Sequence, residues 1–129
     1  MMGPPGSGKG RQARRLAANL GVRHVSVGAL LRSEIDASTD LGHRIADQVE
    51  SGDLVDDVTV VEVVTAALAE LTDGWVLDGA PRTIEQASLL TPVIEGPDPA
   101  RVISLDVPVD EIRDRLLARA TTEDRADDT

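Results

Sequence analysis

The chain has 129 residues and carries 23 acidic against 13 basic side chains, so its formal net charge is −10. A charge of this sign repels nucleic-acid backbones and anionic membrane surfaces, which argues against both as partners. The absence of cysteine excludes disulfides and thiolate chemistry, and no apolar run approaches the roughly 20 residues of a membrane span. The N-terminus lacks the pattern of a signal peptide, so we expect a cytoplasmic protein.

The length corresponds to one domain, in which helical and strand patterns alternate. From the spacing of apolar residues and the caps, the expected helices cover residues 8–20, 29–36, 41–51, 58–71, 83–94 and 108–120. The expected strands cover residues 24–27, 75–78 and 101–107, and the last is the clearest of the three. Strands separated by helices pair in parallel through right-handed crossovers, so the sequence predicts an α/β fold with a parallel sheet.

Two of the expected helices carry more specific predictions. The fourth is apolar around most of its circumference, with Thr59, Glu62 and Thr65 as a narrow polar stripe, so it should be largely buried. The fifth begins with Thr83, which is followed three residues later by Gln86. That spacing is typical of a capping box, in which each residue satisfies a free backbone N–H group of the first turn.

A glycine-rich loop, Gly-Pro-Pro-Gly-Ser-Gly-Lys-Gly at residues 3–10, runs directly into the first helix and contains Lys9, the only lysine in the chain. Glycines let several backbone N–H groups converge on one anion, the helix N-terminus adds its dipole, and the lysine adds a positive charge. The loop therefore indicates a phosphate-binding site. An isolated match can also be an ordinary glycine-rich turn, and the usual motif has Ser or Thr where this chain has Gly10.

A carboxylate, Asp78, ends the expected strand 75–78 and is followed by Gly-Ala-Pro-Arg-Thr at residues 79–83. The carboxyl end of a parallel strand faces the ligand crevice of an α/β sheet, where a carboxylate can organise Mg²⁺ and its waters. The alternative is a solvated turn that precedes a helix cap.

Three arginines near the C-terminal end are further candidates. Arg115 and Arg119 are four residues apart and therefore share one face of the last helix. Glu111 lies four residues before Arg115, so a surface ion pair is an equally good explanation of that arginine. Arg125 lies in a polar tail, where disordered and self-neutralising charge is the usual interpretation.

Taken together and in order, these segments resemble the adenylate kinase family over nearly the whole chain. The matching segments are residues 3–10, residues 26–32 (Ser-Val-Gly-Ala-Leu-Leu-Arg), residues 52–55 (Gly-Asp-Leu-Val), residues 77–83 (Leu-Asp-Gly-Ala-Pro-Arg-Thr) with Gln86, residues 114–119 and residues 125–128. In that family a glycine does follow the lysine of the loop, which removes the objection raised by Gly10.

The resemblance implies a P-loop NTPase fold with helices on both faces of the sheet, and a monomer that transfers the γ-phosphoryl group of Mg²⁺-bound ATP to a nucleoside monophosphate, with AMP favoured. It implies that the ATP phosphates bind to Gly6, Ser7, Gly8, Lys9, Gly10 and Arg11. It implies that the acceptor nucleotide binds to Val27, Arg32, Leu54, Val55, Gly79, Arg82 and Gln86. The implied catalytic residues are Lys9, Arg82, Arg115, Arg119 and Arg125, and Asp78 would hold the metal through water.

The chain also departs from the family pattern. It has Arg11 where the family has threonine after the loop, Val27 and Ala29 where the family has threonine and aspartate, and Ala80 in place of a bulky aromatic residue. These changes put base recognition in doubt. Residues 28–56 would form the acceptor segment. Only five residues separate Arg119 from Arg125, so residues 120–125 would be a vestigial short lid.

We further expect a chain truncated at both ends, with the first strand largely missing, since only Met1 and Met2 precede the loop. Such a chain should be marginally folded and poorly active compared with a version extended upstream. A different interpretation is a degenerate paralogue that binds nucleotides with little or no turnover. A third, a small-metabolite kinase, is disfavoured by the segment at residues 78–83.

Overall fold

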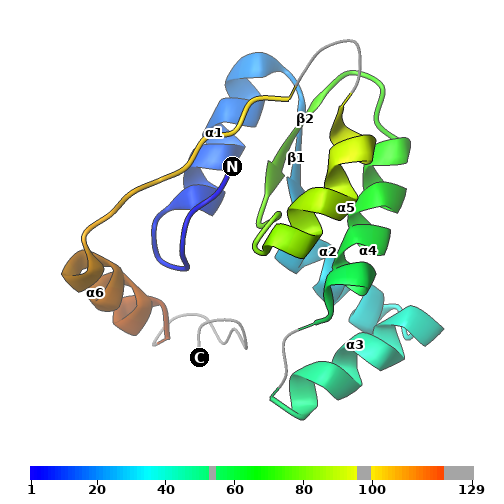
Figure 1. The fold of residues 1–129 in the computed structure, drawn as a ribbon. Helices are drawn as coiled ribbons and strands as arrows, with labels where there is room; N and C mark the ends of the chain where they lie inside the picture. Colours follow the sequence, from blue (N-terminus) through cyan, green and yellow to red (C-terminus); the bar gives the residue numbers. More distant parts are fainter. Residues whose placement is uncertain (53–54, 96–99, 121–129) are drawn as a thin grey trace.

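The computed structural model describes residues 1–52, 55–95 and 100–120, which form an α/β arrangement that is mostly helical (Figure 1). Its elements are α1 (Lys9–Leu20), β1 (Arg23–Ser26), α2 (Val27–Asp36), α3 (Asp40–Glu50), α4 (Asp57–Ala69), β2 (Trp75–Asp78), α5 (Ile84–Ile94) and α6 (Val109–Ala120). Each expected helix is present with bounds close to the predicted ones. Among the described residues, no helix is both long and apolar enough to cross a membrane.

The sheet consists of β1 and β2, which pair in parallel with Arg23 opposite Trp75 and Ser26 opposite Asp78. Three helices, α2 to α4, separate the two strands in the sequence, as parallel pairing requires a long crossover connection. The register places the carboxyl ends of both strands at the same edge of the sheet. In open α/β sheets this edge is where ligands bind.

Residues 101–107, predicted as the clearest strand, form no strand in the structure. Only an isolated parallel bridge joins Ser104 to Met2, whose N–H group donates to Ile103 O at 2.7 Å and whose carbonyl accepts from the Leu105 N–H group at 2.8 Å. On the other side, the Met1 amino group donates to Leu77 O. A ladder needs successive paired residues on a neighbouring segment, and among the described residues Met2 is the one bridge partner of this segment.

The core divides into two clusters on opposite faces of the sheet. Successive residues of a strand point to opposite faces, and accordingly Leu77 joins one cluster and Val76 the other. The larger cluster contains side chains from the sheet, α4 and α5, including Val25, Val60, Val64, Leu68, Leu77 and Leu90. The smaller one joins Val76 to Ala13 and Ala17 of α1. Helices therefore cover both faces, with α1 on one side of the strands and α4 and α5 on the other (Figure 1).

Helix α4 is largely buried as predicted, but its polar stripe differs from the expected one. Thr59 is only 4% exposed, whereas Val58 is 61% exposed. The carboxylate of Asp56 caps the helix and explains the difference. It accepts hydrogen bonds from the Thr59 N–H group at 2.8 Å and from its hydroxyl at 2.9 Å. Because the hydroxyl is satisfied inside the protein, Thr59 can be buried at low cost.

Candidate functional site

The glycine-rich loop turns tightly before α1. Gly6 and Gly8 have φ angles of 82° and 87°, in the left-handed region that residues with a side chain rarely adopt. The Ser7 N–H group donates to Pro4 O at 3.1 Å and closes the turn. Gly8 caps α1 without a side-chain hydrogen bond, so the first turn of the helix presents its backbone N–H groups and dipole toward the loop. This geometry suits an anion such as phosphate.

Ser7 contributes an unsatisfied polar atom to the loop. The residue is 4% exposed, and among the described residues its hydroxyl oxygen has no hydrogen-bond partner. A Cβ atom at Gly3 would lie 2.7 Å from this oxygen, so only glycine fits at position 3 without a shift. A buried hydroxyl without a partner costs stability, and a ligand in the loop would supply one.

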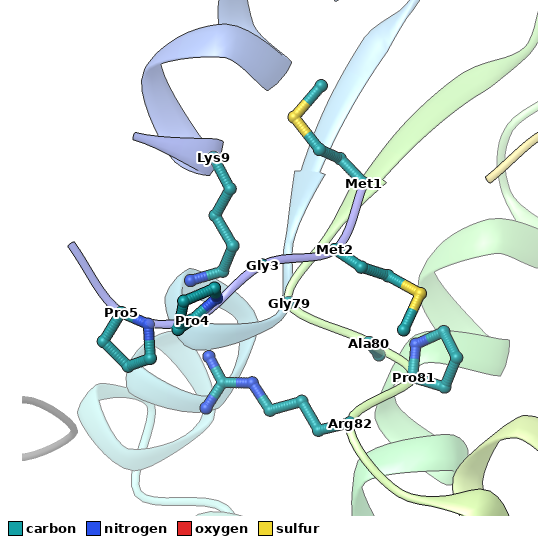
Figure 2. Close-up of a pocket in the computed structure, with 10 residues that line it drawn as sticks. All are labelled: Met1, Met2, Gly3, Pro4, Pro5, Lys9, Gly79, Ala80, Pro81 and Arg82. Carbon is teal, nitrogen blue, oxygen red and sulfur yellow. The ribbon is translucent and has the colours of Figure 1, made fainter. Parts of the chain in front are cut away.

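A cavity of about 290 Å³ lies between the loop and the segment that follows β2 (Figure 2). Its lining includes Lys9 from the start of α1 and Arg82 from the turn before α5. Figure 2 shows the two side chains extending toward Pro4 from opposite sides of the residue 3–5 segment. The structure therefore brings two of the predicted catalytic cations to one cavity, although they are 73 positions apart in the sequence.

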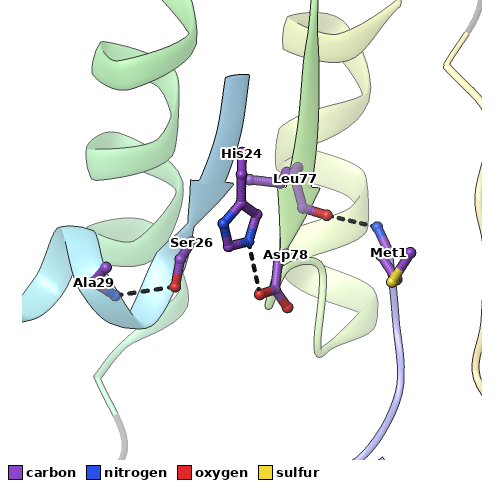
Figure 3. Close-up of polar contacts among 6 residues, drawn as sticks. All are labelled: Met1, His24, Ser26, Ala29, Leu77 and Asp78. Carbon is purple, nitrogen blue, oxygen red and sulfur yellow. Dashed lines mark hydrogen bonds and ion pairs between the residues drawn. The ribbon is translucent and has the colours of Figure 1, made fainter. Parts of the chain in front are cut away.

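Asp78 ends β2 beside the loop and is 6% exposed. One carboxylate oxygen, Oδ2, lies 3.1 Å from His24 Nε2, as Figure 3 shows. The other, Oδ1, is buried and has no hydrogen-bond partner among the described residues. A Cβ atom at Gly10 would lie 3.4 Å from Oδ2, so the carboxylate adjoins the first turn of α1. An orphaned carboxylate oxygen at this position suits a metal-bound water.

Sequence reasoning did not identify His24, although the alternation of strand side chains contains the signal. His24 and Ser26 are two residues apart on β1 and share a face, and Ser26 pairs with Asp78. His24 and Asp78 are therefore diagonal neighbours on one side of the sheet.

Among the described residues, no group of three or more His, Cys, Asp or Glu side chains could hold a metal ion. A metal at Asp78 would therefore take most of its ligands from water and a bound phosphate.

Three of the predicted acceptor residues, Val27, Gly79 and Arg82, lie close together at the end of β2. Val27 is buried at the start of α2, and its Cβ lies 3.4 Å from the point where a Cβ of Gly79 would be. A guanidinium nitrogen of Arg82 lies 3.8 Å from the same point. Arg32 reaches back over its own helix, with a guanidinium nitrogen 3.0 Å from the corresponding point at Gly28. Val55 packs against the larger core cluster, whereas Leu54 lies outside the described residues.

Gln86 is 5% exposed, and both ends of its side-chain amide are hydrogen-bonded. Its Oε1 accepts from the Arg82 N–H group at 2.8 Å, and its Nε2 donates to Asp57 Oδ1 at 2.9 Å. The Thr83 hydroxyl accepts from the Gln86 N–H group and donates to Asp57 Oδ1, both at 3.0 Å. Thr83 caps α5 as predicted, but the Gln86 side chain reaches Arg82 instead of the cap residue. The role of Asp57 was not foreseen, because its partners are 26 and 29 residues away.

Helix α6 lies against the loop through Arg115. A guanidinium nitrogen of this residue lies 3.4 Å from Gly6 O and 3.3 Å from Ser7 O, and another donates to Glu111. The ion pair with Glu111 that the sequence offered as an explanation is therefore present, and the same guanidinium also reaches the loop, while the catalytic role of Arg115 stays a prediction. Arg119 is half-buried on the same helix, whereas Arg125 lies outside the described residues.

Comparison with known proteins decides the family. The model of the family described as adenylate kinase matches residues 1–129. The chain belongs to the adenylate kinase family. This confirms the family inferred from the ordered motifs, and with it the predicted enzyme class, a nucleoside monophosphate kinase.

Several curated members of the adenylate kinase family are similar along almost the whole chain. The adenylate kinase of Synechococcus sp. (strain RCC307) is 42% identical over 125 residues, which cover 95% of this chain and 69% of the relative. That of Synechococcus sp. (strain JA-2-3B'a(2-13)) is 42% identical over 130 residues, covering 98% and 67%. That of Xylella fastidiosa (strain M12) is 39% identical over 133 residues, covering 100% and 71%.

Proposed function

We propose that this member of the adenylate kinase family transfers the γ-phosphoryl group of ATP to AMP and forms two molecules of ADP. In this reaction the bond between the γ-phosphorus and the β,γ-bridging oxygen breaks, and a bond forms between the γ-phosphorus and a phosphate oxygen of AMP. The observation that carries the proposal is the cavity shared by Lys9, from the start of α1, and Arg82, from the segment after β2. The family membership and the P-loop arrangement that it implies support the same conclusion.

On the donor side, the backbone N–H groups of the loop and Lys9 would bind the ATP phosphates. Gly6 and Gly8 permit the backbone conformation, and the hydroxyl of Ser7 would gain its missing partner. Gly10 and Arg11 follow in the first turn of α1, where the helix dipole favours an anion. Binding of ATP would therefore stabilise this part of the protein more than any other.

On the acceptor side, Arg32 and Arg82 would bind the phosphate of AMP. Arginine suits this role because its planar fork contacts two phosphate oxygens at once. Gln86 would contact the base, and the backbone around Val55 and Leu54 would complete its pocket. Val27 and Gly79 would lie under the nucleotide. We assign the acceptor segment to residues 28–56.

Three arginines would act on the migrating phosphoryl group: Arg115, Arg119 and Arg125. Phosphoryl transfer is catalysed mainly by positioning and by neutralising charge on the transferred group, and no covalent enzyme intermediate is required. The contact of Arg115 with the loop carbonyls supports this role, because the loop is the proposed binding site of the ATP phosphates. Arg119 lies on the same helix as Arg115, and Arg125, the last residue of the proposed short lid (residues 120–125), would close on the phosphoryl group from there.

Asp78 would hold Mg²⁺ through water, and its orphaned Oδ1 beside the loop fits that role. When bound, the ion neutralises phosphate charge and orients the phosphate oxygens. His24 would keep Oδ2 in place, which leaves Oδ1 directed at the metal waters. We also retain the cytoplasm as the expected compartment and a monomer as the expected form.

The proposal is tested by measuring ADP formation from ATP in the presence of Mg²⁺ with AMP, CMP and UMP as acceptors, beside an equilibrium measurement of ATP binding. We expect AMP to be the best acceptor, with looser selectivity than usual because Val27 lacks the hydroxyl of the family's threonine. Clear preference for CMP or UMP would overturn the adenylate assignment and leave the kinase class intact. Binding of ATP without turnover of any acceptor would favour the degenerate paralogue.

A further inference from the structure

We propose that Asp57 is a positioning residue that holds the side-chain amide of Gln86 in one of its two orientations, and that it thereby favours adenine over 6-oxopurines as the acceptor base. The inference rests on the proposed function, in which Gln86 contacts that base. Asp57 lies in the first turn of α4, on a different helix from Gln86. It would act on selectivity without touching the nucleotide.

The hydrogen-bond partners of Gln86 distinguish the two ends of its amide. An ionised carboxylate only accepts hydrogen bonds, so the Gln86 atom 2.9 Å from Asp57 Oδ1 must be the nitrogen. The Arg82 backbone N–H group only donates, so the atom 2.8 Å from it must be the oxygen. A rotation of the amide by half a turn would place two acceptors against each other at one end and two donors at the other.

The surroundings of the Gln86 amide also oppose a change in its orientation. Gln86 is 5% exposed, so water has little access to replace a lost partner. The hydroxyl of Thr83 donates its one proton to the same Asp57 oxygen while it accepts from the Gln86 N–H group. Asp57 is therefore held by two donors from the first turn of α5 and cannot turn away without breaking both bonds.

The fixed amide retains one free N–H group and one free lone pair, which are the two features that a purine edge can meet. Adenine presents an amino donor at position 6 and an acceptor at N1, whereas a 6-oxopurine presents an acceptor and a donor in the same places. One amide orientation is complementary to adenine and the reversed orientation is complementary to the 6-oxopurine. Asp57 opposes the reversal at one end of the amide, and the Arg82 N–H group opposes it at the other, so removing the carboxylate should weaken the selection between the two bases.

The decisive variant is Asp57→Asn, which keeps the size and shape of the side chain but can donate as well as accept. Asn can turn its amide nitrogen toward Gln86, so a reversed Gln86 amide then finds a donor at position 57, and the preference for AMP over IMP in kcat/KM should fall by about tenfold, the scale of one bidentate base contact. The change should be in the KM values of the acceptors, while the KM of ATP stays within about twofold, since the donor side is untouched. Glu62→Gln removes one carboxylate from the exposed face of α4 and is the matched control, with an unchanged AMP to IMP ratio.

An unchanged AMP to IMP ratio in Asp57→Asn would overturn the inference, as would an equal loss for AMP, IMP and ATP, which indicates general destabilisation. If Asp57→Asn does not fold, Asp57→Ser replaces the carboxylate by a hydroxyl that can donate or accept and is assayed in the same way. If the parent chain turns over neither acceptor, the proposed function fails separately. Calorimetric binding of AMP and IMP to the parent and both variants then decides the inference, by the same ratio of affinities.

Discussion

The phosphate loop and the segment that leads into α5 line the same cavity, but the polar groups near the loop and those at the start of α5 are satisfied in opposite ways. Near the loop, Ser7 Oγ and Asp78 Oδ1 are buried and have no hydrogen-bond partner among the described residues. At the start of α5, the side chains of Thr83 and Gln86 and the carboxylate of Asp57 form one connected network. The loop is an incomplete polar site, whereas the α5 turn is a completed one.

This contrast separates two ways of preparing a site for a ligand. Unsatisfied buried polar atoms cost stability, and a site keeps them where a ligand completes their hydrogen bonds. A satisfied network holds side chains in their working geometry before the ligand arrives, which reduces the loss of freedom on binding. We therefore expect nucleotide to stabilise the loop strongly and to change the α5 turn little.

The largest effect is expected for Lys9→Met, which keeps the approximate length of the side chain and removes its positive charge from the phosphate loop. A charge-assisted contact to phosphate contributes about 1.5–3 kcal/mol, so the affinity for ATP should fall by at least tenfold. The affinity for AMP should change by less than about threefold. Titration calorimetry with each nucleotide measures both.

Arg15→Met is the matched control for this experiment, because it removes one positive charge from the exposed face of the same helix. It should leave the ATP affinity unchanged within about twofold, the scale expected for a screened surface charge. An ATP affinity that changes by less than about threefold in Lys9→Met, where the parent binds measurably, would show that the loop is not the phosphate site.

A smaller effect is expected for Gly6→Ala, which tests the contact between the loop and α6. Gly6 has a φ angle of 82°, and a Cβ atom there would lie 3.1 Å from Leu116 Cγ and 3.2 Å from Ile112 O. The left-handed conformation alone costs roughly 1–2 kcal/mol for a residue with a side chain. We expect the sum of strain and crowding to lower the melting temperature and weaken ATP binding.

Gly21→Ala provides the control, since Gly21 has a φ angle of 69° but no atom within 4 Å of the added Cβ. It carries the backbone strain without the crowding. The difference in melting temperature between the two variants therefore measures the contact with α6. Equal melting temperatures, together with unaltered ATP binding by Gly6→Ala, would mean that α6 does not rest on the loop in solution.

Local patterns were sufficient to predict most elements and the loop. Apolar spacing and caps located α1 to α6, and the glycines and Lys9 of the loop act within a few residues of one another. Local patterns were not sufficient for the segment at residues 101–107, which was predicted as a strand but forms only an isolated bridge. Its alternation is that of a strand, but a strand also needs a partner along its length, and Met2 alone bridges to it among the described residues. Pairing is a long-range property that the segment's own residues do not encode.

The site shows the same division between local and long-range information. Arg82 and Asp78 were predicted from one contiguous motif, whereas the partners that orient that motif come from elsewhere in the chain. His24 is 54 residues from Asp78, and Asp57 is 29 residues from Gln86. His24 could have been found from the strand register, which requires knowing that β1 and β2 are neighbours. Asp57 required the packing of α4 against α5, for which the sequence carries no comparable rule.

The smallest effect is expected at Asp56, which caps α4. Because it directly precedes Asp57, it supports the hydrogen-bond network at the start of α5. Gln48 Nε2 donates to its carboxylate at 2.8 Å, and the Thr59 N–H group donates to it at 2.8 Å. These hydrogen bonds, that of Gln48 first, lower the pKa of Asp56 below its ordinary value of 3.8. The stabilisation is therefore fully present above about pH 4 and is lost as the pH falls through the lowered pKa of the folded state.

We expect Asp56→Ala to lower the free energy of unfolding by about 1 kcal/mol at pH 7, the usual contribution of a helix N-cap, and by less at pH 2.5. Asp56→Asn keeps a capping oxygen that cannot be protonated, so its stability should stay near that of the parent at pH 7 and depend less on acid. Urea unfolding at both pH values measures these differences. Because α4 carries Asp57, Asp56→Ala should also weaken AMP binding slightly and leave ATP binding unchanged. A loss of affinity confined to ATP would show that the start of α4 supports the phosphate loop and not the start of α5. The proposed difference between these two regions would then be wrong.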